Sequence, residues 1–164
     1  MSTAFRNQRG FTLVELIIVI LIIGILSALA LPRFINMGAD ARTAKVQSMM
    51  GAVRSASQVV RAAALVRGQT GATGSVVVDG VTISTVYGYP AALSTGNGAT
   101  GIVDAAGMDT SGNNNDGIAL SGGGASALVI AVNGAGTPAN CSVSYTAPAA
   151  ANATPAVVLT TTGC

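Results

Sequence analysis

The chain has 164 residues, enough for one modest domain and an appendage. Half of its residues are hydrophobic, only 9% are charged, and the mean hydropathy of +0.60 is high for a soluble protein. There is no His, no Trp and a single Glu, which removes the most common general base, the most common zinc ligand and any chemistry of paired Glu side chains. We therefore predict that the chain is not an enzyme and has no cofactor.

Charge is distributed unevenly along the chain. All eight Lys and Arg residues lie at or before Arg67, whereas Glu15 and Asp40 are the only acidic residues before Asp79. The basic residues are spread too thinly, with too few aromatic residues among them, to form a nucleic-acid-binding surface. We predict no nucleic-acid partner.

An apolar segment follows a short basic start. Residues 16–31 carry no charge, and extending this stretch back to Leu13 adds only the charge of Glu15. The length fits a membrane-spanning helix, which needs about 20 apolar residues. Arg6 and Arg9 precede the segment, so the positive-inside rule keeps the N-terminus in the cytoplasm and places the later residues on the far side of the membrane.

Glu15 lies at the leading edge of this apolar segment, and three roles are open for it. Thr12-Leu13-Val14-Glu15 matches the capping box, in which the Thr and Glu side chains bond free backbone donors at a helix start. In a secretory signal peptide cleaved at Ala28-Leu29-Ala30, Glu15 would simply be removed. In the third role, the Glu15 carboxylate pairs with an oppositely charged group inside the membrane. An ionisable group at membrane depth costs free energy, so it usually has such a partner.

The stretch Gly10-Phe11-Thr12-Leu13-Val14-Glu15, with a short basic leader before it and an apolar helix after it, resembles the signature of type IV prepilins. The resemblance implies that a membrane peptidase removes residues 1–10 by cleavage between Gly10 and Phe11, and that the new N-terminal Phe11 is methylated. It also implies that Glu15 pairs with the Phe11 amine of a neighbouring subunit during assembly. Two charges in a low-dielectric filament core are stabilised only when matched, so this pairing would set the register of the subunits.

A second helical pattern begins after Pro32. Its polar residues fall on a different face from its apolar residues, which predicts an amphipathic helix over residues 34–67 that ends near Gly68. Joined to the apolar segment of residues 11–33, it forms one helix of about 55 residues. The residues expected to face a domain are Val46, Met49, Met50, Val53, Ser57, Val60 and Ala64.

Gly24 and Pro32 are predicted flexure points within this helix. Proline removes a backbone donor and clashes with the preceding turn. The resemblance implies that the helix is often melted between such positions in assembled pili. The alternative is a tolerated proline kink in a membrane helix.

The second half of the chain, residues 68–164, is predicted to be a β-rich globular head. Within residues 76–83, Asp79-Gly80 suits a type I′ turn between β-branched runs, which predicts a β-hairpin. Together with the long helix, the strands predict an α+β fold, with a small antiparallel sheet packed on the amphipathic face, as in the type IV pilin fold that the chain resembles. Further strands are predicted over residues 127–132, 141–146 and 156–162, and residues 94–124 are predicted to be loop.

Cys141 and Cys164 are the only cysteines, and they lie too far apart in sequence for a CxxC motif. Export would deliver both to an oxidising compartment, where cysteine pairs form disulfides. We predict a Cys141–Cys164 disulfide that pins the last strand. The resemblance agrees, because type IV pilins close a C-terminal loop with two cysteines.

Two further motifs are short. Val86-Tyr87-Gly88-Tyr89-Pro90 resembles the mannose-sensitive haemagglutinin branch of these pilins, and its alternative interpretation is a turn with two packing tyrosines.

Residues 109–117 fail the EF-hand pattern, because counting back from Gly117 puts Gly112 at the first ligand position and no Glu closes the loop. Some related pseudopilins bind calcium in a surface loop, but we predict a solvated Asn-rich turn here and no metal site.

The resemblance implies a structural subunit of a type IV pilus. Such a subunit is held in the bacterial inner membrane before assembly, then polymerises through its N-terminal helix into an extracellular helical filament used for adhesion or motility. Its implied partners are further copies of itself, the prepilin peptidase and the pilus assembly machinery. Two alternatives are a major-type pseudopilin of a type II secretion system and a secreted soluble binding domain released after Ala30.

Overall fold

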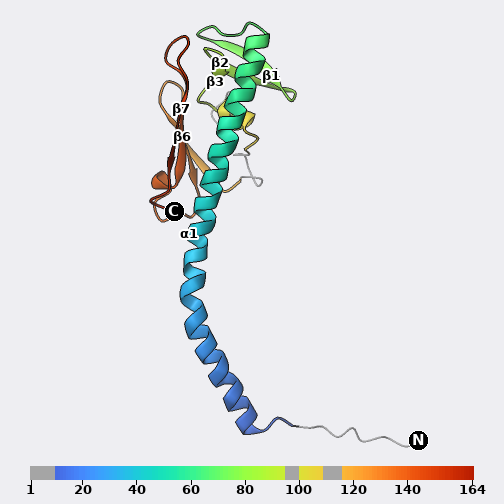
Figure 1. Ribbon diagram of the computed structural model, residues 1–164, viewed down its shortest axis with the longest axis vertical. Coiled ribbons are helices and arrows are strands. Elements are labelled where there is room, and N and C mark those ends of the chain that lie inside the picture. Colours follow the sequence, from blue (N-terminus) through green and yellow to red (C-terminus); the bar gives the residue numbers. More distant parts are fainter. Residues whose placement is uncertain (1–9, 95–99, 109–115) are drawn as a thin grey trace, which may run out of the picture. The chain divides into compact units, whose positions relative to one another are not determined.

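The computed structural model describes residues 10–94, 100–108 and 116–164, with the backbone alone described at residues 30–36. The chain divides into two compact units, one ending at Gly38 and the other spanning Ala39–Cys164. Helix α1 (Leu13–Val66) begins in the first unit and continues into the second (Figure 1). The single long helix is confirmed, and it ends where predicted, just before Gly68 with its φ of +67°.

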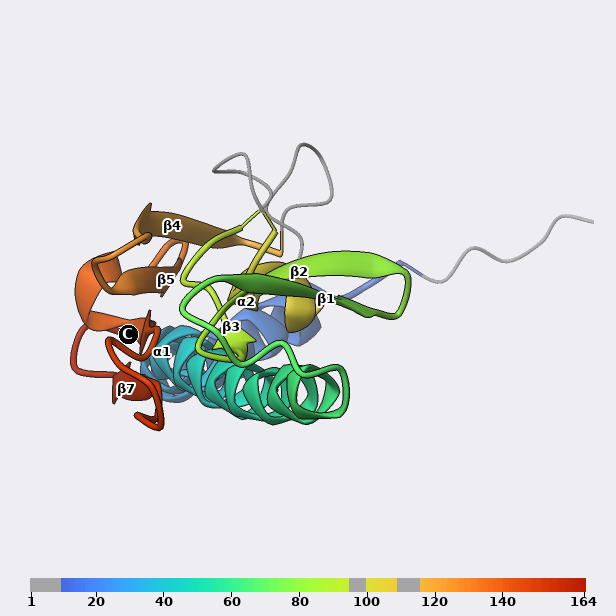
Figure 2. The ribbon, with the colours of Figure 1, turned by 90° about the horizontal axis from the view of Figure 1, so that it is seen from above.

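The second unit contains two antiparallel sheets, one of three strands and one of four (Figures 1 and 2). The α+β class is confirmed, but the strands divide into two sheets where one was expected. In each sheet the hydrogen-bonded neighbours are also consecutive in sequence, so the pairings are local. The elements are β1 (Gly74–Val78), β2 (Val81–Val86), β3 (Tyr89–Pro90), α2 (Ile102–Ala105), β4 (Ile118–Gly122), β5 (Leu128–Val132), η3 (Pro138–Asn140), β6 (Ser142–Thr146) and β7 (Ala156–Thr160).

One face of α1 supplies the helical part of the core of the second unit, and it serves both sheets in turn. Val53 belongs to a large cluster with residues of the four-stranded sheet, such as Ile130. Two helical turns further on, Val60 packs in a smaller cluster with Val76 and Ile83 of the three-stranded sheet. The predicted face is confirmed, since Met50 is partly buried against the large cluster and the other members are buried: Val46, Met49, Val53, Ser57, Val60 and Ala64.

Two tight turns shape the three-stranded sheet. Asp79 and Gly80, with φ of 47° and 81°, connect β1 to β2, and positive φ at both positions is the mark of a type I′ turn. The predicted hairpin is confirmed. Tyr87 and Gly88, with φ of 50° and 79°, connect β2 to β3 in the same way. The alternative interpretation of residues 86–90 as a turn is therefore confirmed, whereas the pairing of β3 with β2 was not predicted.

Gly88 is fixed in this second turn by Arg61 of α1. The Arg61 Nη1 atom donates a hydrogen bond to the Tyr87 carbonyl oxygen at 2.7 Å, and the guanidinium carbon lies 4.8 Å from the centre of the Tyr89 ring. A Cβ atom on Gly88 would overlap Arg61 Nη1, whereas a Cβ on Gly80 would meet open space.

We expect Gly88→Ala to lower the free energy of unfolding more than Gly80→Ala does. Both substitutions cost about 1–2 kcal/mol for a left-handed backbone, and Gly88→Ala also displaces Arg61 from its hydrogen bond. Urea unfolding of the two variants measures the difference. Equal losses in the two variants would show that Arg61 does not restrict this turn.

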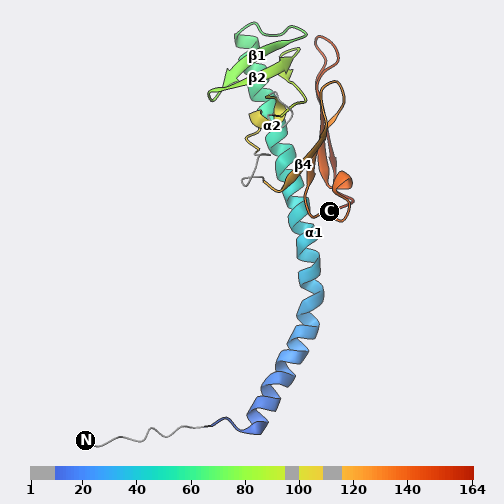
Figure 3. The same ribbon diagram turned by 180° about the vertical axis from the view of Figure 1, so that it is seen from behind.

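The segment of residues 94–124 was predicted as loop, and its described part is not entirely so. Ile102 and Val103 of α2 are fully buried, and the Asp104 side chain accepts a hydrogen bond from the Gly101 backbone at 2.8 Å. Strand β4, labelled in Figure 3, pairs with β5 along its whole length. The prediction was wrong here because glycines surround both short apolar runs and hide their pattern.

Tyr145 of β6 connects the two sheets. It is fully buried, and its hydroxyl donates a hydrogen bond to the Pro90 carbonyl oxygen of β3 at 2.7 Å. Burial raises the pKa of Tyr145, because the phenolate would lose its hydration.

This raised pKa predicts a loss of stability in alkali. Above about pH 10 the unfolded chain releases the phenol proton while the folded chain keeps it, so the folded state becomes less stable as the pH rises. We expect the Tyr145 phenol to lower the free energy of unfolding by up to about 1.4 kcal/mol for each pH unit above this value. The variant Tyr145→Phe has no phenol at this position, so its free energy of unfolding should lack this contribution to the pH dependence. Urea unfolding across this pH range measures it, and identical slopes in both proteins would contradict the assignment.

Candidate functional site

The start of α1 is organised by Thr12 and Glu15. The Thr12 backbone N and Oγ1 atoms both donate hydrogen bonds to Glu15 Oε2, at 2.9 Å and 2.7 Å, and the Glu15 backbone N donates to Thr12 Oγ1 at 3.2 Å. This reciprocal arrangement is a capping box, as the sequence predicted. It starts the helix at Leu13 and holds the Glu15 carboxylate beside the first turn.

Gly10 and Phe11 lie immediately before the helix. Both are exposed, Phe11 to 86%, and the backbone there has no regular secondary structure. A Cβ atom added at Gly10 would meet nothing within 4 Å. The Gly10–Phe11 bond is therefore accessible, while its cleavage and the methylation of Phe11 stay predictions. Arg6 and Arg9 lie outside the described residues.

Among the described residues of the first unit, nothing packs against the apolar half of α1. Every described side chain from residue 10 to residue 29 is exposed, including Leu16 at 59%, Ile22 at 50% and Leu26 at 60%. These side chains cover all sides of the helix, whereas a helix at the surface of a globular protein has only one apolar face. Apolar surface on this scale marks a site of association with other apolar groups.

Within the described part of the chain, no helix reaches the combined length and hydropathy of a membrane span. The membrane span expected over residues 11–33 stays a prediction. The backbone of α1 is helical at both Gly24 and Pro32, and flexure at these positions in a filament also stays a prediction.

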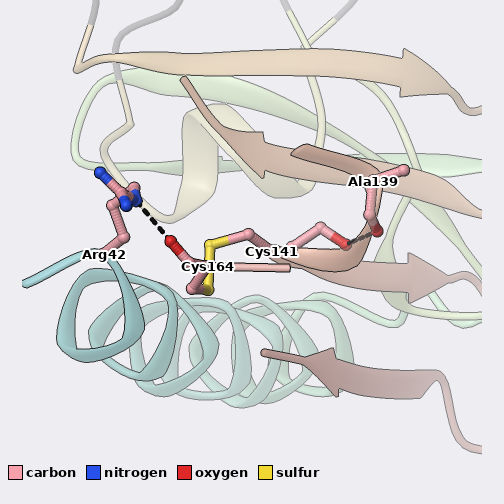
Figure 4. The surroundings of a disulfide bond; sticks show 5 residues. Arg42, Ala139, Cys141 and Cys164 are labelled. Atoms are coloured by element: carbon pink, nitrogen blue, oxygen red, sulfur yellow. Dashed lines mark hydrogen bonds between the residues drawn. A yellow bond between two sulfur atoms is a disulfide. The ribbon is translucent and has the colours of Figure 1, made fainter. Parts of the chain in front are cut away.

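Cys141 and Cys164 form the expected disulfide, with the two Cα atoms 4.8 Å apart (Figure 4). Cys141 is fully buried in the large core cluster, and Cys164 packs against the same cluster. Arg42 of α1 donates a hydrogen bond from Nε to the Cys164 carbonyl oxygen at 2.6 Å. The disulfide and Arg42 together fasten the end of the chain to β6 and to the helix. Sequence reasoning missed Arg42, because nothing in its local pattern sets it apart from the other helical arginines.

No metal centre is found among the described residues, where no group of three or more His, Cys, Asp or Glu side chains is placed to hold an ion. Most of the motif at residues 109–117 lies outside the described residues, so the predicted Asn-rich turn is not tested. Lys45 of α1 donates a hydrogen bond to the Asp116 carbonyl oxygen at the end of that motif.

Known proteins resemble this chain at its N-terminal end. The prokaryotic N-terminal methylation motif matches residues 5–31. The type IV narrow pilus major component PilA5 of Thermus thermophilus is 54% identical over 50 residues, which are 30% of this chain and 43% of that protein. A type IV major fimbrial protein FimA of Dichelobacter nodosus is 41% identical over 75 residues, which are 44% of this chain and 48% of that protein.

A third relative, the type IV major pilin protein PilA of Myxococcus xanthus, is 44% identical over 52 residues, which are 32% of this chain and 24% of that protein. The chain thus spans less than half the length of each of these relatives. No solved structure matches the chain. From the methylation motif into the long helix, the N-terminal segment of the chain is similar to that of type IV pilins.

Proposed function

We propose that the chain is the structural subunit of a type IV pilus and has no enzymatic role. Many copies polymerise through residues 11–33, which pack against one another in the core of a helical filament, and the β-rich heads form its outer surface. The observation that carries this proposal is the exposure of apolar side chains on all sides of α1 from Leu13 to Leu29. Burying them among equivalent helices would contribute about 25 cal/mol for each Å² of apolar surface removed from water.

Glu15 is the proposed assembly residue within this apolar surface. In the single subunit, both hydrogen bonds from Thr12 go to the Oε2 atom of Glu15. Within the described residues Oε1 makes no hydrogen bond, so it is available to the Phe11 amine of a neighbouring subunit. The capping box and the intersubunit ion pair are therefore compatible, and the cap presents the carboxylate in a fixed direction.

Before assembly, the apolar segment holds the subunit in the inner membrane with its N-terminus in the cytoplasm. The run of uncharged residues from 16 to 31 supports this stage. The prepilin peptidase then cleaves the exposed bond between Gly10 and Phe11 and methylates Phe11, and the assembly machinery moves the subunit into an extracellular pilus for adhesion or motility. The matched relatives are named as pilus and fimbrial proteins, which favours a pilus over a pseudopilus.

Immunogold electron microscopy with an antibody against residues 39–164 tests this proposal. We expect gold particles along the full length of thin surface filaments, and the protein in the fraction sheared from whole cells. Label confined to the cell envelope, or protein found only in the soluble culture medium, would overturn the filament function. A strain that lacks the gene is the matched control for the antibody.

A further inference from the structure

A cleft of about 320 Å³ lies in the second unit and is lined by residues of α1, of β3 and of the chain at the start of β7. Its volume is at the lower end of the range for small-molecule sites, about 300–1,000 Å³, which is enough for a ligand the size of a monosaccharide. The lining residues include Arg54, Ser57 and Gln58 of α1, Tyr89 of β3, and Thr154 and Val157.

The polar side chains of this cleft are not used to hold the fold together. Arg54, Gln58 and Thr154 are exposed, and within the described residues none of them makes a hydrogen bond or an ion pair with the protein. The Tyr89 hydroxyl likewise has no hydrogen-bond partner in the described part of the chain, although the residue as a whole is only 9% exposed. A cation, an amide and two hydroxyls therefore converge on one cleft with their hydrogen-bonding capacity free.

Ser57 gives a second, independent indication. It lines the cleft, is only 2% exposed, and its buried hydroxyl has no hydrogen-bond partner. The phenol of the neighbouring Tyr145 donates its proton to the Pro90 carbonyl oxygen and not to Ser57. A buried polar group without a partner destabilises the fold and calls for an explanation, and a polar ligand bound in the adjoining cleft would supply one.

The lining also defines the charge of the ligand. Arg54 is a cation, and no carboxylate is among the lining residues. Arg61 lies over the Tyr89 ring at 4.8 Å and adds a second positive charge next to this lining residue. A guanidinium group without a partner binds a carboxylate through two parallel hydrogen bonds. The amide and hydroxyl groups around it are suited to alcohol groups, which both donate and accept.

We propose that this cleft binds a carboxylated sugar, with the carboxylate on Arg54 and the sugar hydroxyls on Gln58, Tyr89 and Thr154. The site would give the head a specific contact with acidic polysaccharide on a surface. The proposal does not depend on the filament function, because the cleft lies within one subunit. Binding can therefore be measured on separate subunits.

Titration of the full-length ¹⁵N-labelled chain in detergent micelles with D-glucuronate tests the proposal by NMR. We expect saturable shifts at residues 54, 57, 58, 89 and 154, and no such shifts with D-glucose at the same ionic strength. Arg54→Gln should weaken glucuronate binding by about tenfold or more, since a charge-assisted hydrogen bond is lost. Arg67→Gln is the matched control, because it removes an equal charge just after the end of α1 and outside the cleft.

Each other outcome overturns all or part of the proposal. If acetate binds as tightly as glucuronate, the cleft holds a free carboxylate and the sugar contacts are wrong. If Arg67→Gln weakens binding as much as Arg54→Gln, the attraction is general electrostatics and not a site. Absence of shifts at the cleft residues excludes binding of this ligand. An unchanged spectrum outside the cleft shows that Arg54→Gln is folded.

Discussion

Replacing Glu15 with Gln is expected to abolish filaments while leaving the subunit folded and processed. In the filament core the Phe11 amine of the neighbouring subunit would lose its carboxylate, and breaking one partner of a buried ion pair costs about 3–5 kcal/mol. This corresponds to a loss of more than about a hundredfold in the association constant at each contact. Counting filaments by electron microscopy and measuring the sheared protein against total protein gives the result.

The choice of Gln separates the two roles of Glu15. Glutamine can still accept the hydrogen bonds of Thr12, because Glu and Gln serve equally in a capping box. If Glu15 acted only as a helix cap, Glu15→Gln would therefore assemble normally, and that result would contradict the ion pair. Asp79→Asn is the matched control, since it removes a carboxylate from the exposed hairpin turn and should leave the filaments intact.

The second large effect concerns the disulfide. We expect the double variant Cys141→Ala and Cys164→Ala to lower the free energy of unfolding by about 2–4 kcal/mol, because the bond constrains the unfolded chain over a separation of 23 residues. Cys141 is also fully buried, so the loss of its sulfur leaves space in the core. Urea unfolding of the full-length chain in detergent micelles measures the loss.

Two controls accompany the disulfide experiment. Reduction of the native chain should reproduce the loss seen in the double variant and should leave the variant itself unchanged. Arg42→Gln should cost less, about 1 kcal/mol, because it removes a single hydrogen bond to the Cys164 carbonyl oxygen. A double variant as stable as the native chain would show that the core and Arg42 suffice to hold this end of the chain.

The parts of the fold that could be predicted from sequence are those specified by local patterns. The spacing of residues such as Val46, Val53 and Val60 specifies one face of a helix, and that face is buried. Asp79-Gly80 between β-branched runs specifies a hairpin, and the turn forms there. The capping box of Thr12 and Glu15 is likewise contained within four residues.

The features that were missed depend on contacts between distant segments. The pairing of β3 with β2 depends on the turn at Tyr87-Gly88, where a tyrosine has a positive φ that few sequences favour, and Arg61 from the distant helix stabilises this turn. The division of the strands into two sheets depends on which strands pair, and alternation along a strand does not reveal its partner. The cleft at Arg54 could not be found from sequence either, because Thr154 lies a hundred residues away from it.

The most direct test of the proposed pilin function is the N-terminal sequence and intact mass of the protein sheared from the surface of cells. We predict a start at a methylated Phe11, with Glu15 retained, and a mass two hydrogens short because of the bond between Cys141 and Cys164. A start at Leu31 would remove the apolar segment together with Glu15. That result would make the chain a small secreted domain and would contradict assembly through the N-terminal helix.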